Sequence, residues 1–231
     1  MSICKNKKRR YYRFRADRFY GGIATADCMG CNLDCAFCWS YYTKENPMMG
    51  NFYSSKDVAL RLIKIAKNNG FRYVRISGNE PTLCRDHLLN VIKTVERKTN
   101  LTFILETNGI ELGKNEDYIE DLKEFKNLHV RVSFKVGNPN HFEIITNRPK
   151  SWFNYQLKAI EYLYKHKVSF HPAIVKEYHD EYLIKRLVDV DSNIARNLEF
   201  ESLKITAPIK RRLLRRGLLK NGSIPLNLED F

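Results

Sequence analysis

The sequence predicts an α/β protein built around a parallel sheet, and three observations support that fold class. Short, apolar, β-branched stretches alternate with amphipathic helical stretches along most of the chain. Six strand–helix units follow one another, an order that implies right-handed crossovers between parallel strands. Several strands alternate polar and apolar residues. Parallel strands covered by helices on both faces are almost continuously apolar, so helices should cover only one face of this sheet. Six units are too few to close an eight-stranded barrel.

The first strand is expected at residues 21–27, directly before a loop rich in cysteine. A helix should follow over residues 55–68. Ser54 and Asp57 form a start for this helix that resembles a capping box, and Gly70 is expected to stop it.

The later elements continue the alternation. Strands are expected at residues 71–77, 101–106, 128–134, 168–175 and 198–205. Helices are expected at residues 117–125, 139–147, 151–166 and 180–190, together with one that carries the apolar stripe Leu88, Leu89, Ile92 and Val95. No low-complexity linker interrupts the series, so the length of 231 residues predicts one main domain.

Polar residues gather on one face of four strands. They are Thr102 and Glu106, then His129, Arg131, Ser133 and Lys135, then Ser169 and His171, and finally Glu199 and Glu201. Apolar faces should meet the helices, so these polar faces should line the inside of the fold. Because unpaired buried charges are costly, the lining indicates a binding cavity, with Arg131, His171 and Glu199 as candidate substrate-binding residues. The alternative is that some of these residues pair with one another at an exposed sheet edge.

The net charge of +14 is concentrated at the two ends of the chain. Residues 1–18 and residues 204–220 each carry a charge of +7, while the remainder is close to neutral. This distribution favours an anionic partner, most often nucleic acid, with Arg211 and Arg212 as candidate contacts. Two solvated basic tails are the alternative.

No run of eighteen apolar residues is present, so no membrane span is expected. The basic and aromatic N-terminus lacks the apolar core of a signal peptide. We therefore expect a cytoplasmic protein whose thiols stay reduced.

Four of the six cysteines lie within residues 28–38. Disulfides are not expected, because a chain of this length buries an adequate core without cross-links. Paired zinc knuckles usually stand a dozen or more residues apart, which is farther than here. The spacing Cys31-x3-Cys35-x2-Cys38 fits an iron–sulfur cluster in which one of four irons lacks a protein ligand. Cys28 and Cys84 fall outside this set. Cys28 is a buried apolar residue, a ligand of a second cluster, or a thiyl or hydrogen-donor position, and Cys84 is either buried and inert or faces the same cavity.

With Phe37 in the aromatic position, this motif resembles the signature of the radical S-adenosylmethionine (SAM) superfamily. The resemblance implies an open partial (β/α)6 barrel with parallel strands over residues 21–206. A basic aromatic N-terminal extension (1–20) and a basic C-terminal extension (207–231) would flank the barrel. It also implies a 4Fe–4S cluster on Cys31, Cys35 and Cys38, with SAM chelated at the open iron and Phe37 near its adenine.

Further cofactor-binding residues follow from the same resemblance. Gly78-Asn79-Glu80 resembles the family's Gly-Gly-Glu segment, which holds the SAM amino group, and Glu80 would accept from that ammonium group. Asn79 replaces a glycine, a change that is tolerated in a left-handed conformation. Asn108 resembles residues on the ribose side. Ser133 and Lys135 match positions aimed at the ribose and carboxylate of SAM.

The implied activity is reductive cleavage of SAM to a 5′-deoxyadenosyl radical, which abstracts hydrogen from a substrate. A reductant such as ferredoxin or flavodoxin would supply the electron. Two segments, Ser-Gly-Asn-Glu-Pro-Thr at residues 77–82 and Glu-Thr-Asn-Gly at residues 106–109, resemble glycyl-radical activating enzymes, which act on a protein. The segment Cys-Ala-Phe-Cys-Trp at residues 35–39, with Asn46-Pro47 after it, resembles tRNA wybutosine-synthesising enzymes, which act on RNA. The alternative from a different class is a zinc-containing nucleic-acid-binding module without catalysis.

Overall fold

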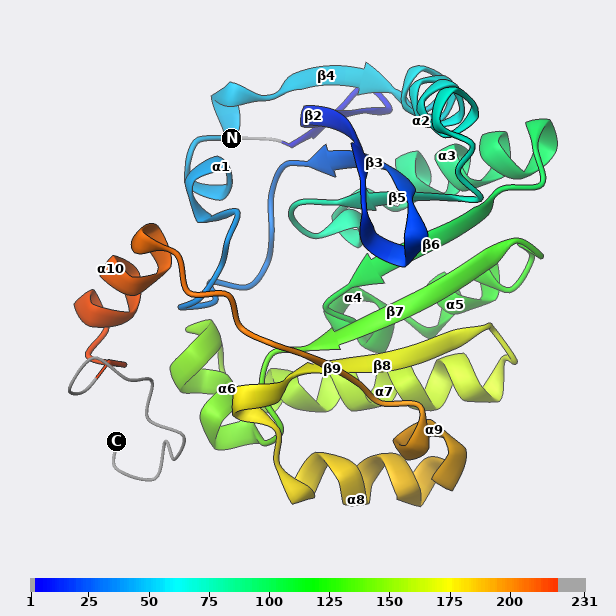
Figure 1. Cartoon of the computed structure of the whole chain (residues 1–231). Coiled ribbons are helices and arrows are strands. Elements are labelled where there is room, and N and C mark those ends of the chain that lie inside the picture. Colours follow the sequence, from blue (N-terminus) through cyan, green and yellow to red (C-terminus); the bar gives the residue numbers. More distant parts are fainter. Residues whose placement is uncertain (1–2, 220–231) are drawn as a thin grey trace.

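The computed structural model describes residues 3–219, and it confirms the α/β fold class with an open, mostly parallel sheet (Figure 1). Within those residues, nine strands form one sheet in the order β1-β2-β3-β5-β6-β7-β8-β9, with β4 paired to β2. The strands from β3 to β9 on this path are parallel to one another. They are β3 (Ile23–Cys28), β5 (Tyr73–Ser77), β6 (Thr102–Thr107), β7 (Leu128–Phe134), β8 (Phe170–Val175) and β9 (Glu199–Glu201). These six strands form the expected open partial (β/α)6 barrel.

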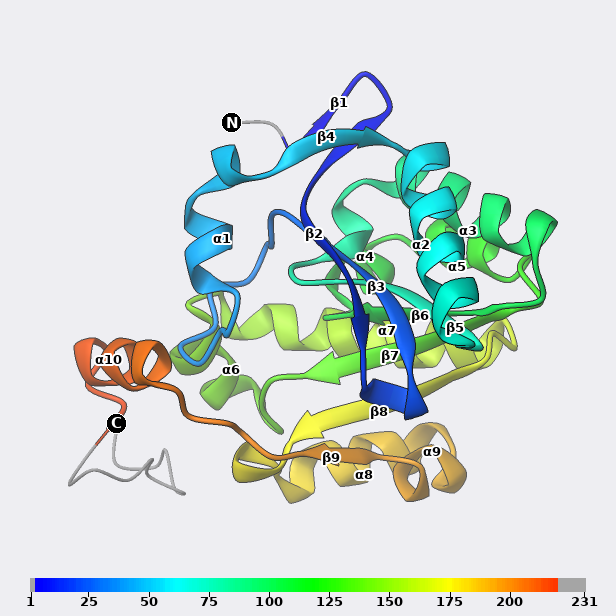
Figure 2. The same ribbon diagram turned by 45° about the horizontal axis from the view of Figure 1, so that its top comes forward.

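Helices connect successive parallel strands and cover one face of the sheet (Figures 1 and 2). They are α2 (Ser55–Asn69), α3 (Arg85–Lys98), α4 (Ile110–Lys114), α5 (Glu116–Leu122), α6 (Pro139–Thr146), α7 (Phe153–Lys165), α8 (Glu181–Val190) and α9 (Ser192–Arg196). The ends of α2 are as predicted: the Ser54 side chain accepts a hydrogen bond from the backbone N–H of Asp57, and Gly70 is left-handed. The short helix α4 was not predicted. It packs so closely on α7 that a Cβ on Gly113 would lie 1.7 Å from the carbonyl oxygen of Tyr155.

The N-terminal segment extends the sheet, which the sequence reading did not anticipate. Strand β2 (Lys8–Asp17) pairs antiparallel with β3 and with β1 (Cys4–Lys5), and along its opposite side with β4 (Asn51–Ser54). Its pattern is hard to recognise because basic residues occupy both faces. Even Arg9 is buried, with its guanidinium donating to the backbone carbonyls of Met29, Glu80 and Pro81.

Cys4 and Cys84 form a disulfide with their Cα atoms 6.2 Å apart, which corrects the expectation that the chain has none. Cys84 accordingly does not face the central cavity. The two residues are 80 positions apart, and only the pairing of β1 with β2 brings them together. Sequence spacing alone therefore gave no sign of the bond.

Two elements near the C-terminus also differ from expectation. Strand β9 has three residues instead of the eight predicted over residues 198–205. Beyond it, helix α10 (Ala207–Arg215) lies beside α6 and the loop that leads to α1 (Tyr41–Glu45) (Figure 2). Residues 220–231, the end of the expected C-terminal extension, lie outside the described residues. No helix among the described residues has the length and apolarity needed to cross a membrane.

Candidate functional site

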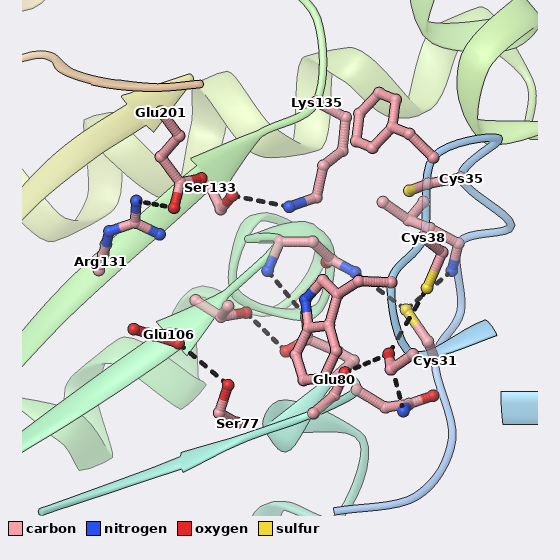
Figure 3. Close-up of a pocket in the computed structure, with 18 residues that line it drawn as sticks. Cys31, Cys35, Cys38, Ser77, Glu80, Glu106, Arg131, Ser133, Lys135 and Glu201 are labelled. Carbon is pink, nitrogen blue, oxygen red and sulfur yellow. Dashed lines mark hydrogen bonds and ion pairs between the residues drawn. The ribbon is translucent and has the colours of Figure 1, made fainter. Parts of the chain in front are cut away.

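Three cysteines line a cleft at the carboxyl ends of the parallel strands (Figure 3). Cys31, Cys35 and Cys38 come from the loop between β3 and α1 and face the ends of β5, β6 and β7. Every residue predicted to bind SAM also lines this cleft: Phe37, Gly78, Asn79, Glu80, Asn108, Ser133 and Lys135. Cys28, at the end of β3, is fully buried and does not line it.

The cysteine loop is held by backbone hydrogen bonds to distant segments. The carbonyl oxygen of Gly30 accepts from the Glu80 N–H at 2.9 Å. The N–H groups of Asp34 and Ala36 donate to Thr146 and Ile145 at the end of α6, at 2.9 and 2.8 Å. The loop therefore has a defined shape although it contains no regular helix or strand.

Burial makes two of the thiols in this loop poor acids. It raises the pKa of Cys31 well above its ordinary value and that of Cys35 to about 11, the latter against the opposing positive charges of Lys135 and Arg212. Such sulfurs become thiolates when a metal replaces the proton. Cys31 Sγ already accepts from the Leu33 N–H at 3.4 Å and from Asn108 Nδ2 at 3.8 Å. Donors of this kind stabilise the thiolate ligands of iron–sulfur clusters.

The donor set fits a cluster with an open iron. Three free cysteines border one cleft, and no other sulfur among residues 3–219 lines it. Among the described residues, no three His, Cys, Asp or Glu side chains are grouped to hold a single metal ion. The zinc-containing module stays an alternative that metal analysis tests.

The turn after β5 meets the cysteine loop through Ser40. The Ser40 hydroxyl donates to the carbonyl oxygen of Gly78 and lies 3.5 Å from Cys38 Sγ. The left-handed residue of this turn is Gly78, with φ of 92°. A Cβ there would stand 3.1 Å from the backbone of Asp27. Asn79 is not left-handed, so its replacement of a glycine is tolerated for another reason. Its buried Oδ1 has no hydrogen-bond partner and is an available acceptor in the cleft.

Glu80 is occupied by protein donors. Its buried carboxylate accepts from the Thr82 N–H, the Thr82 and Thr107 hydroxyls and the Asn108 N–H at 2.6–3.1 Å. Glu80 therefore joins the turn after β5 to the turn after β6. Its expected contact with the SAM ammonium group stays a prediction. Lys135 lies opposite, with Nζ donating to Ser133 Oγ at 2.6 Å.

The polar strand faces form a network that extends from the cleft to the exposed edge strand β9, so the predicted lining and the predicted mutual pairing both occur. Arg131 donates to Glu199 at 2.8 Å and lies 2.6 Å from Glu201. His171 contacts Glu199 at 2.8 Å and His129 at 2.7 Å. Arg131 and Glu201 line the cleft, while His171 and Glu199 stand behind them. The hydrogen bond from His171, opposed by burial and strengthened by Arg131, lowers the pKa of Glu199 to about 2.

Glu106 lines the cleft, as the polar face of its strand predicted, whereas Trp39, Ser40 and Ser77 were not among the predicted site residues. Trp39 and Ser40 directly follow Cys38, so their position in the chain was the available signal. Ser77 and Glu106 are joined at 3.1 Å, and Glu106 also accepts from Arg75 at 2.6 Å.

The two arginines predicted to contact a substrate on α10 differ in their surroundings. Arg211 is exposed. Arg212 is buried, stacks on the Tyr41 ring at 3.6 Å and pairs with Asp34 in the cysteine loop. Arg212 is therefore withdrawn from the surface on which a nucleic acid would bind, and its predicted contact needs correction.

Comparisons with known proteins show what this chain is similar to. A family model described as the radical SAM superfamily matches residues 28–187. A probable GTP 3′,8-cyclase of Methanococcus maripaludis is 32% identical over 116 residues, which are 50% of this chain and 37% of that protein. A GTP 3′,8-cyclase of Mannheimia succiniciproducens is 26% identical over 173 residues, covering 73% of this chain and 48% of its own length. The chain thus spans less than half the length of these curated relatives.

Two solved structures share the fold. SuiB of Streptococcus suis bound to S-adenosylmethionine superposes with a TM-score of 0.57 at 19% identity, covering 78% of this chain and 41% of SuiB. Spore photoproduct lyase complexed with dinucleoside spore photoproduct gives a TM-score of 0.54 at 18% identity, covering 87% of this chain and 61% of the lyase.

Proposed function

This chain belongs to the radical SAM superfamily, and on that premise we propose that it abstracts a hydrogen atom from a macromolecular substrate. The cofactors of the family are a 4Fe–4S cluster and SAM. When bound, they supply the radical chemistry, while the protein binds, orients and excludes solvent.

One observation carries the proposal: the three cysteines and all the residues expected around SAM line the same cleft. Cys31, Cys35 and Cys38 would hold the cluster. Asn79 Oδ1, a buried acceptor without a partner, suits an ammonium group. Lys135, at the opposite wall, suits a carboxylate.

Exposed aromatic and basic side chains near the cleft favour a large substrate. Trp39 lines the cleft and is 60% exposed, and Tyr42 and Met48 are also exposed close to it in the chain. Lys210, Arg211 and Arg215 are exposed on α10. Exposed aromatic residues near cations are typical of surfaces that bind nucleic acid or protein. The substrate we propose is accordingly an RNA or a protein segment, with a ferredoxin or flavodoxin as the reductant.

A second candidate is a reaction on GTP. It is favoured by the 32% identity with a probable GTP 3′,8-cyclase. The matched region is 37% of that relative, so the likeness does not extend to the whole of that protein.

Anaerobic reconstitution tests the common part of both candidates. Wild type should bind about four irons per chain and form 5′-deoxyadenosine from SAM with a strong reductant. Cys35→Ala should bind less iron and form no 5′-deoxyadenosine. Cys28→Ala is the matched control, since Cys28 lies outside the cleft, and it should keep the cluster. A colourless wild-type protein with about one zinc per chain would refute the proposal.

Binding assays then separate the substrates. A triple variant with Lys210, Arg211 and Arg215 changed to glutamine removes exposed charges only. If the substrate is RNA, wild type should bind tRNA with a salt-dependent affinity that the triple variant loses. Equal and weak binding by both proteins would favour a protein segment. Consumption of GTP together with 5′-deoxyadenosine formation would favour the second candidate.

A further inference from the structure

Asp34 is a point of contact between the cysteine loop and the C-terminal helix. It stands between the predicted ligands Cys31 and Cys35. Its carboxylate meets three cations: Lys44 Nζ at 2.7 Å, Arg212 and Arg216. The two arginines come from the end of α10, 178 and 182 positions farther along the chain. We call these four residues the Asp34 node.

The node is packed into the protein. The Arg212 side chain is 9% exposed, and its guanidinium stacks on the Tyr41 ring at 3.6 Å. Arg216 also donates to the carbonyl oxygen of Ile145, the same carbonyl that accepts from the loop N–H of Ala36. Ile209 and Leu213 of α10 are buried. Exposed ion pairs contribute little, whereas a partly buried, multiply bonded pair restricts both segments.

The charges of the node do not balance. Three cations face Asp34. Of these three, Glu45 contacts only Lys44: Glu45 Oε1 approaches from the solvent side and lies 3.0 Å from Lys44 Nζ. Among residues 3–219, one positive charge is left over. Within the same residues, two guanidinium nitrogens of Arg212, Nε and Nη1, are buried without a hydrogen-bond partner. Buried cations of this kind are costly unless an anion lies close by. A cluster held by three thiolates carries negative charge and is the anion expected beside this loop.

We propose that Asp34 is a positioning residue that ties α10 to the cysteine loop, so that α10 both fixes the three ligands and stabilises the negative charge of the cluster. Asp34 does not touch the cluster. It acts by fixing the loop, and Arg212 acts by its charge. This inference rests on the cluster implied by family membership and is independent of the substrate proposed above.

Arginine pairs on α10 give matched variants for the test. Arg212→Gln removes a node residue, and Arg211→Gln makes the same chemical change at its exposed neighbour. Arg216→Gln and Arg215→Gln form a second pair. Asp34→Asn removes the anchor, and Asp34→Glu restores its charge. Thermal unfolding of each metal-free variant checks that the chain still folds.

The first measurement is the rate at which reconstituted protein loses its cluster to an iron chelator under anaerobic conditions. Residues that orient metal ligands typically change metal affinity about 10-fold or more when replaced. Asp34→Asn and Arg212→Gln should therefore lose the cluster about tenfold faster than wild type. Arg211→Gln and Arg215→Gln should stay within about twofold, and Asp34→Glu should recover most of the loss.

The second measurement is the reduction potential of the cluster, which a purely structural contact would not change. Removing a nearby positive charge disfavours the reduced cluster. Arg212→Gln should lower the ratio of reduced to oxidised cluster at least threefold, or about 28 mV at 59 mV per tenfold. Arg211→Gln should leave the ratio unchanged.

If wild type holds a cluster and the node variants match their controls in both measurements, this inference is wrong and the proposed function stands. If wild type takes up no cluster, both are overturned.

Discussion

Replacing Glu80 with glutamine tests whether this buried carboxylate holds two loops of the site together. Oε1 accepts from the Thr82 N–H and from the hydroxyls of Thr82 and Thr107, while Oε2 accepts from the Asn108 N–H at 2.8 Å. The amide oxygen of glutamine can keep the three donors at Oε1. The amide NH2 would then face the Asn108 N–H, so two donors would oppose each other.

The expected cost has two parts. Loss of the charge-assisted bond to Asn108 costs about 1.5–3 kcal/mol, and leaving that buried N–H unsatisfied costs about 1–3 kcal/mol. The sum is about 2.5–6 kcal/mol, which is a large share of the usual stability of a domain. It should appear as a lower midpoint with an unchanged slope in urea unfolding of metal-free protein.

A surface control isolates the effect of burial. Glu124→Gln makes the same change at an exposed position and should shift the free energy of unfolding by less than about 0.5 kcal/mol. If Glu80→Gln also stays within about 1 kcal/mol of wild type, the carboxylate does not bridge the two turns and the reasoning fails.

Three further predictions concern stability. Burial lowers the pKa of His87 from 6.5 to about 4, so its neutral form is favoured in the fold, with Tyr11 Oη at 3.0 Å from Nε2. The contribution of His87 to the free energy of unfolding, at most about 3 kcal/mol, should be complete above pH 6.5 and decline as the pH falls toward 4. His87→Gln should flatten the dependence of stability on pH in this range, and an unchanged dependence would contradict the prediction. Reducing the Cys4–Cys84 disulfide, which spans 80 residues, should cost about 4 kcal/mol in thermal unfolding. The Cys4→Ser variant should be insensitive to reductant and as unstable as the reduced wild type. If this variant is as stable as the oxidised wild type, the disulfide does not stabilise the fold. Gly113→Ala should cost about 3 kcal/mol or more, because its Cβ would overlap the carbonyl oxygen of Tyr155; a melting temperature equal to wild type would disprove that close approach.

The sequence by itself determined the strand–helix alternation, the ends of α2 and the spacing of the three cysteines. Each of these depends on residues that are near one another in the chain. The caps of α2 act over three or four positions, and alternation along β7 sets which residues face the cleft. Local periodicity decides such features before any tertiary contact forms.

The tertiary structure decided which of these residues meet. The disulfide, the donors to Glu80 from Thr107 and Asn108 and the pairing of Arg212 with Asp34 join residues that lie apart in the chain, by as much as 178 positions in the last case. A basic residue in the C-terminal segment looks the same in the sequence whether it faces solvent, like Arg211, or a partly buried carboxylate, like Arg212. Only the packing of α10 against the cysteine loop separates the two, because burial and charge pairing depend on three-dimensional neighbours and not on sequence neighbours.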